Sequence, residues 1–98
     1  MTRAALFVSL ALAAGCGSSA PDATAVKNAL ETRLAAKGLS FEWVVCARTE
    51  RSFEGRSVFR CNVNFGEPHI VRYCATLEDG TLVTNREQPA MRCGRYAS

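Results

Sequence analysis

Five cysteines and one histidine are the residues of this chain whose side chains could do chemistry. A thiol can act as a nucleophile, a metal ligand or one half of a disulfide. Metal sites favour closely spaced thiols, typically a Cys-x-x-Cys pair, and this sequence has none. We therefore expect no metal, no other cofactor and no catalytic cysteine. The cysteines are Cys16, Cys46, Cys61, Cys74 and Cys93, and the last four are 15, 13 and 19 positions apart.

His69 is the only histidine, and it is the natural candidate for acid–base catalysis near neutral pH. It follows the turn sequence Gly66-Glu67-Pro68, where Glu67 could serve as its carboxylate partner. A histidine at the start of a strand is more often exposed than catalytic, and no established catalytic motif accompanies it. We expect a protein that is not an enzyme, and we keep a small enzyme using His69 as a third hypothesis.

The beginning of the chain has the composition of an export signal. Arg3 supplies a positive charge, and an uncharged run of about 11 residues extends from Ala4 to Ala14. As a helix this run would be about 17 Å long, whereas the hydrocarbon core of a bilayer is roughly 30 Å thick. The run is too short to span the bilayer, so we expect residues 1–15 to be a signal peptide that is removed.

The residues Ala13-Ala14-Gly15-Cys16 resemble the lipobox of bacterial lipoprotein precursors, with Ala13 where that family usually has Leu. The resemblance implies that Cys16 carries a diacylglyceryl group, with acyl chains such as palmitate, which attaches the protein to a membrane of the cell envelope. Residues 16–24 would then be the lipidated cysteine and a flexible linker. The alternative is cleavage by an ordinary signal peptidase at the small residues 11–14, which would leave a secreted or periplasmic protein.

The rest of the chain predicts one helix followed by strands. Asp22 can cap a helix that Gly38 ends, and Val26, Leu30 and Leu34 form its apolar stripe. The segments after Gly38 change to strand periodicity, and we expect most of their aromatic side chains, Trp43 among them, to lie in the core. The predicted strands are residues 40–48, 56–65, 69–77 and 81–85.

These elements predict an α+β fold: one N-terminal helix packed on a three- to four-stranded antiparallel β-meander, stapled by two disulfides. The chain has room for a single small domain, residues 25–98. A domain of this size is marginal without covalent help, and two disulfides in an oxidising compartment would supply it.

Assigning one cysteine to lipid leaves an even set of four, which allows three disulfide pairings. A hairpin centred near residues 53–54 places Cys46 opposite Cys61, whereas a turn after the second strand also places Cys61 near Cys74. We favour Cys46 with Cys61 and Cys74 with Cys93, although this reasoning leaves the other pairings open.

Two weaker resemblances concern the folded part. The segments Val44-Val45-Cys46 and Val58-Phe59-Arg60-Cys61 with Gly55 between them are similar to small actinobacterial lipoproteins and secreted domains of unknown function, although Ala47 stands where Pro is usual. This resemblance implies no activity. A helix wrapped by an antiparallel sheet also resembles the cystatin architecture, but residues 49–55 lack the inhibitors' Gln-x-Val-x-Gly loop. A secreted cystatin-like inhibitor or small-ligand carrier is therefore our second functional hypothesis.

The charge pattern suggests a binding surface. A net charge of +3 is too small to predict nucleic-acid binding. Arg56, Arg60 and Arg72 can share the polar face of neighbouring strands, and Phe53 lies in a charged loop, so these four are our candidate partner contacts. A solvated sheet face is the alternative. The leading hypothesis is a lipid-anchored, non-enzymatic binding module for an envelope protein or anionic polymer.

Overall fold

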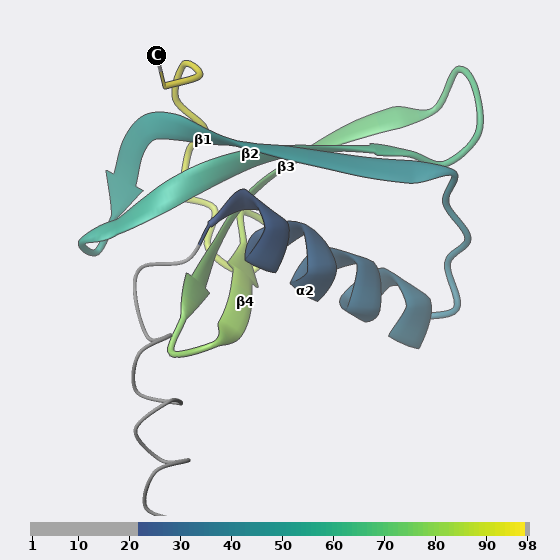
Figure 1. The fold of residues 1–98 in the computed structure, drawn as a ribbon, viewed down its shortest axis with the longest axis horizontal. Coiled ribbons are helices and arrows are strands. Elements are labelled where there is room, and N and C mark those ends of the chain that lie inside the picture. Colours follow the sequence, from purple (N-terminus) through teal and green to yellow (C-terminus); the bar gives the residue numbers. More distant parts are fainter. Residues whose placement is uncertain (1–21, 98) are drawn as a thin grey trace, which may run out of the picture.

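The computed structural model describes residues 22–97. The predicted signal peptide, Cys16 and most of the predicted linker lie outside the described residues. The described chain consists of one helix followed by one antiparallel sheet of four strands (Figure 1). The predicted α+β class is confirmed.

The helix α2 (Ala23–Ala36) begins and ends where its sequence predicts. The side chain of Asp22 accepts a hydrogen bond of 2.8 Å from the backbone N–H of Ala25, which satisfies one of the free amides of the first turn. The helix ends before Gly38, whose φ of +78° is a left-handed conformation that glycine adopts without strain. Its buried side chains are Val26, Leu30 and Leu34.

The sheet is a meander in which each strand pairs with the next one along the chain. Short turns at residues 54–55 and 79–80 and a longer one at residues 65–69 connect the strands. The first strand starts later and runs further than predicted. The strands are β1 (Trp43–Phe53), β2 (Arg56–Asn64), β3 (Ile70–Glu78) and β4 (Thr81–Thr84).

The favoured pairing of Cys46 with Cys61 is confirmed, but the hairpin that carries it is less regular than expected. The turn lies at residues 54–55, so a regular hairpin would not place the two cysteines opposite each other. An irregularity in β1 between Arg48 and Ser52 shifts the register and restores the pairing. The disulfide joins directly opposed residues whose Cα atoms are 4.0 Å apart.

One face of the sheet packs against α2 and forms the main core. Side chains alternate between the two faces of each strand, so residues two positions apart share a face. All four strands send apolar side chains toward the helix, and the two central strands β2 and β3 do so at alternate positions. The buried sheet residues of this core are Val44, Phe59, Cys61, Val63, Tyr73, Ala75 and Leu82.

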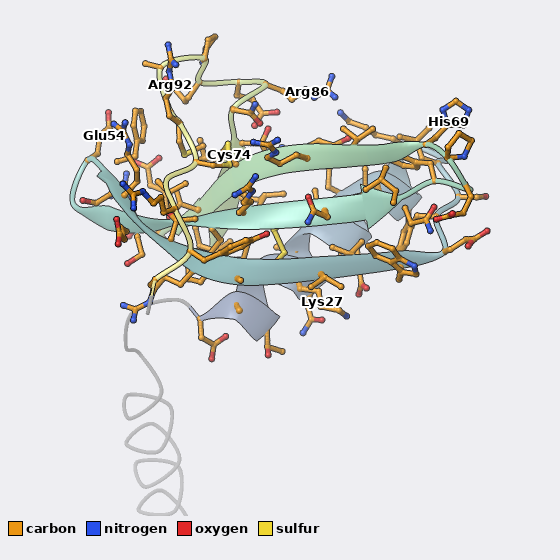
Figure 2. The ribbon with its side chains drawn as sticks, turned by 90° about the horizontal axis from the view of Figure 1, so that it is seen from above. Lys27, Glu54, His69, Cys74, Arg86 and Arg92 are labelled. Atoms are coloured by element: carbon orange, nitrogen blue, oxygen red, sulfur yellow. A yellow bond between two sulfur atoms is a disulfide. The ribbon has the colours of Figure 1, made fainter. Side chains whose placement is uncertain are left out.

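The opposite face is covered at one end by the tail, residues 86–97, as Figure 2 shows. Met91 of the tail packs with Val58 and Cys74 in a second, smaller cluster. The Cys74–Cys93 disulfide fastens the tail to β3, and an isolated bridge between Thr49 and Tyr96 aligns it with β1.

The two disulfides therefore lie on opposite faces of the sheet. Cys61 pairs across the strands with Tyr73, which places the neighbouring Cys74 on the other face. This alternation is the physical reason that Cys61 does not bond to Cys74, the competing possibility that turn spacing alone allowed.

Replacing Cys74 and Cys93 together by alanine should lower the free energy of unfolding by about 3 kcal/mol, because the crosslink restricts the unfolded chain. Urea unfolding of the variant measures this loss. Hydrogen exchange should also show lost protection at the backbone amide of Ala97, which donates to Arg48 in the intact protein. Unchanged protection of that amide would mean that the disulfide is not what holds the tail.

Candidate functional site

The part of the second sheet face that the tail leaves uncovered is the candidate site, and we call it the open face. Its positions follow from the register: Val45 pairs with Asn62, which pairs with Arg72. In the neighbouring row, Trp43 and Ile70 both pair with Asn64 from opposite sides. The open face is defined by Trp43, Val45, Asn62, Ile70 and Arg72.

Three large apolar side chains are exposed on this face. Trp43 is 41 % exposed, Val45 56 % and Ile70 47 %. The expectation that Trp43 lies in the core is wrong, because Val44 is the residue that points at α2 and the residues on either side of it must point away. Phe59 and Tyr73 are buried as expected, whereas Tyr96 is 48 % exposed.

Asn64 anchors the end of the open face. It is 2 % exposed, and its Oδ1 accepts a hydrogen bond of 2.7 Å from the backbone N–H of Gly66. The turn is closed by the backbone N–H of His69, which donates to the carbonyl of Gly66, and by that of Phe65, which donates to the carbonyl of His69. These bonds fix the chain just before Ile70 and so place its side chain in the row of Trp43, on the other side of Asn64.

All four predicted contact residues lie on the side of the sheet opposite α2, and Arg60 and Arg72 are the two that lie in or next to the open face. Arg72 is exposed, and the described residues place no carboxylate oxygen within 4.0 Å of its guanidinium. Arg60 is half-buried, with its guanidinium carbon 4.9 Å from the centre of the Tyr96 ring.

The other two predicted contact residues lie at the far end of the sheet. The guanidinium of Arg56 is 3.2 Å from a carboxylate oxygen of Glu54 and 3.3 Å from one of Glu78. Phe53 is half-buried against the second cluster, beside Val58. Arg56 is thus matched by acidic partners, and Phe53 packs under the tail instead of projecting as a loop anchor.

His69 is exposed at the end of the sheet, as Figure 2 shows. Within residues 22–97 no carboxylate oxygen lies within 4.0 Å of its ring nitrogens. The pairing of His69 with Glu67 that the sequence suggested is therefore not formed in the described chain.

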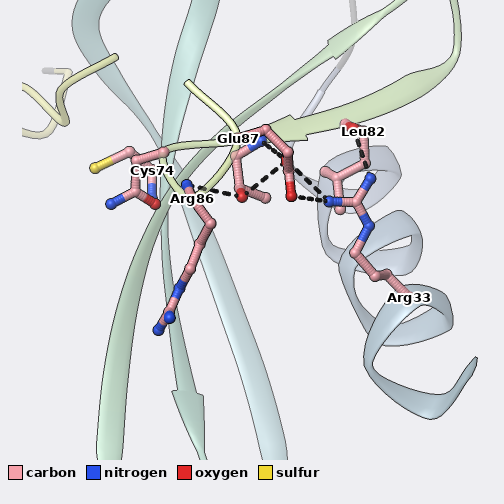
Figure 3. A network of polar contacts seen from close by, with 7 residues as sticks. Arg33, Cys74, Leu82, Arg86 and Glu87 are labelled. Carbon is pink, nitrogen blue, oxygen red and sulfur yellow. Dashed lines mark hydrogen bonds and ion pairs between the residues drawn. The ribbon is translucent and has the colours of Figure 1, made fainter. Parts of the chain in front are cut away.

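A small cleft lies between α2 and the sheet, with a volume of about 160 Å³. Its apolar lining includes Leu30 and Leu34 of the helix and Tyr73 of β3, and its charged lining includes Lys37 and Arg86. The Arg86 guanidinium lies 5.1 Å from the centre of the Tyr73 ring. Figure 3 shows this side chain directed away from the neighbouring Glu87.

A polar network around Glu87 ties α2 to the end of β4 (Figure 3). Its carboxylate accepts hydrogen bonds from the backbone N–H of Thr84 at 2.8 Å, from the Thr84 hydroxyl at 3.0 Å and from Arg33 at 3.0 Å. The same Arg33 donates to the backbone carbonyl of Leu82 at 2.8 Å. Partial burial on its own raises the pKa of Glu87, but these hydrogen bonds and the charge of Arg33 outweigh it and lower the pKa below its ordinary value.

The sequence pointed to Arg60 and Arg72 through strand periodicity, but it missed Val45 and Ile70. The available signal for Ile70 was the turn at residues 65–69, because a register derived from it places Ile70 opposite Asn64. Tyr96 lies in an irregular segment, where no periodicity could assign it to a face.

Compared with known proteins, the chain matches no family model, no curated protein and no solved structure. The two disulfides indicate an oxidising compartment outside the cytoplasm. Among residues 22–97, no helix is long and apolar enough to cross a membrane.

The Glu87→Gln variant should be less stable by about 1 kcal/mol near neutral pH, because a half-exposed carboxylate loses the charge-assisted part of its hydrogen bonds. The folded-state pKa of Glu87 is lower than the unfolded-state value of 4.5. Its stabilisation is therefore present above that pH and is lost as the pH falls through the folded-state pKa. Urea midpoints of the two proteins should converge in acid, and a constant difference from neutral to acidic pH would contradict this role.

Proposed function

We propose that this protein is a non-enzymatic binding module, held at a bacterial envelope membrane by lipid on Cys16, which binds an acidic partner protein on its open face. The observation that carries the proposal is the exposure of Trp43, Val45 and Ile70 together with Arg72 on one sheet face. A small domain gains stability by burying such side chains, so their exposure favours a role in contact with another molecule.

The chemistry of the open face favours a protein over other partners. Tryptophan and arginine are enriched at protein–protein interfaces, and here Val45 and Ile70 extend the apolar patch beside them. Between Val45 and Arg72, Asn62 adds a half-buried amide that can form directional hydrogen bonds with a partner. An anionic polymer would contact the arginine but would leave the three exposed apolar side chains without an apolar partner.

The charge of the face favours an acidic partner. Arg72 has no carboxylate partner within the described chain, and Arg60 lies one row away on β2. An acidic residue at the rim of the partner would pair with Arg72 and steer the encounter.

The proposed anchor supports the same role. Lipid with two or more acyl chains holds a protein stably at a bilayer, whereas one chain does not. Five residues lie between Cys16 and the helix cap at Asp22, so the start of the domain would stay within about 20 Å of the anchor. The exported location that this requires agrees with the two disulfides.

The small-ligand carrier is the second candidate function, and the cleft between α2 and the sheet is the observation that favours it. Its volume of about 160 Å³ is well below the roughly 300–1,000 Å³ of pockets that enclose a drug-sized ligand. The open face is therefore the better-supported binding surface.

Mass spectrometry of the unreduced protein from the membrane fraction should show a diacylglyceryl group on Cys16 and no residues before it. The Cys16→Ala variant should leave the membrane fraction, because the acyl chains supply the attachment. An unmodified wild-type protein in the medium, cleaved near residue 14, would overturn the anchor.

The Ile70→Ser variant should bind the partner at least tenfold more weakly, because loss of an anchoring side chain costs about 2 kcal/mol of binding free energy. Binding is measured in intact cells by crosslinking from a photoreactive residue placed at position 45. The Ile70→Ser variant is compared with the matched control Leu39→Ser, and both carry the photoreactive residue. Leu39 is 46 % exposed, close to the 47 % of Ile70, but it lies outside the open face. Equal crosslinking in both variants would contradict the proposed surface.

A further inference from the structure

A separate hollow lies where the tail crosses the same side of the sheet, next to the irregular part of β1. It has a volume of about 610 Å³ and is shallow and widely open to solvent. We call it the arginine hollow, because Arg51 of β1, Arg60 of β2 and Arg95 of the tail line it, together with Glu50 and Gly94.

The three arginines come from segments far apart in sequence and are held by constraints that do not involve a ligand. The Cys74–Cys93 disulfide fixes the tail just before Arg95. The backbone N–H of Glu50 donates a 2.9 Å hydrogen bond to the carbonyl of Arg95, which ties the tail to β1 at the hollow. A site assembled in advance binds with a smaller entropic cost than one that must form on binding.

Gly94 is needed for this close approach of the tail to β1. A Cβ atom at this position would lie 2.7 Å from Cγ of Arg51 and 3.1 Å from its backbone nitrogen. A side chain at this position would therefore force either the Arg51 side chain or the tail to shift.

The positive charge of the hollow is largely unmatched. Of the residues that the structure describes, none places a carboxylate oxygen within 4.0 Å of Arg51, Arg60 or Arg95. Glu50 is the only acidic residue among those that line the hollow, so its net side-chain charge is positive.

Arg60 is the most constrained of the three. The Tyr96 ring lies against its guanidinium at 4.9 Å, and its Nε is buried without a hydrogen-bond partner in residues 22–97. Because this Nε is buried, Arg60 can offer a molecule in the hollow only its terminal Nη groups.

The number of donors distinguishes between possible anions. Each guanidinium offers five N–H groups in a planar fork that can bind two oxygens at once. A carboxylate has only two oxygens and is saturated by two such forks, whereas a phosphate group presents three or four oxygens in a tetrahedral arrangement. Three arginines from three segments of the chain offer more donors than a carboxylate accepts and so match the larger anion better.

We propose that the arginine hollow binds a phosphate group, either of a soluble phosphoester or of a phospholipid headgroup. The hollow shares none of its lining residues with the open face, so this site does not depend on the proposed partner protein.

The test is a titration of the oxidised full chain with inorganic phosphate, followed by backbone amide NMR, against sodium chloride at equal ionic strength. Phosphate should produce saturable shifts at Ser52, Gly94 and Arg95, and chloride should not. Arg51→Gln should weaken phosphate binding about tenfold, the effect of losing one charge-assisted contact. Arg51 is exposed, so the variant should keep the fold.

Arg48→Gln is the matched control. Arg48 is also an exposed residue of β1, but it pairs with Phe59 and lies on the helix side of the sheet near Asp22. Its loss removes the same charge and should leave phosphate binding within twofold of wild type. Equal weakening in the Arg48→Gln and Arg51→Gln variants, or the absence of saturable shifts with phosphate, would overturn the site.

Vesicles of phosphatidylglycerol mixed with phosphatidylcholine distinguish the two sources of phosphate. Vesicle binding that is lost in Arg51→Gln and absent with pure phosphatidylcholine would support a lipid headgroup as the ligand. Saturable binding of inorganic phosphate without vesicle binding would support a soluble phosphoester. Vesicle binding by the Cys16→Ala variant is measured in parallel, so that a lipid anchor cannot account for the result.

Discussion

The pairing of β1 with β2, locked by the Cys46–Cys61 disulfide, is the constraint on which the rest of the structure depends. A shift of one residue in this register would turn every side chain of β1 to the opposite face. In the observed register Val44 packs on α2, and Trp43 and Val45 face away from it. The composition of the open face is therefore a consequence of the register.

A second constraint is that one helix can cover only one face of a four-stranded sheet. The opposite face must be covered by the remaining chain, which is the tail after β4, or be left to solvent. The tail has few apolar residues of its own, and Met91 is the one buried in the second cluster. The Cys74–Cys93 disulfide therefore supplies the attachment that apolar burial alone would give in a larger domain.

The two proposed binding surfaces lie on the side of the sheet opposite α2. The chain enters the described domain at Asp22, in the helix layer, so an anchor at Cys16 would join the layer that does not carry these surfaces. The two surfaces differ in chemistry because the tail divides them. Where the tail is absent, apolar side chains are exposed, and where it crosses β1 it adds Arg95 to the arginines of the strands.

The sequence by itself determined the helix, its cap at Asp22, an antiparallel meander of three to four strands and the presence of two disulfides, because these depend on local periodicity, turn residues and widely spaced cysteines. It also placed Arg60 and Arg72 on one face, since strand alternation is a local property. Only the tertiary structure decided which face of β1 meets α2, because alternation defines two faces without saying which one a distant helix will cover. The grouping of Arg51, Arg60 and Arg95 was likewise beyond sequence reasoning, since it depends on a β-bulge and on the path of an irregular tail, and neither has a periodic signal.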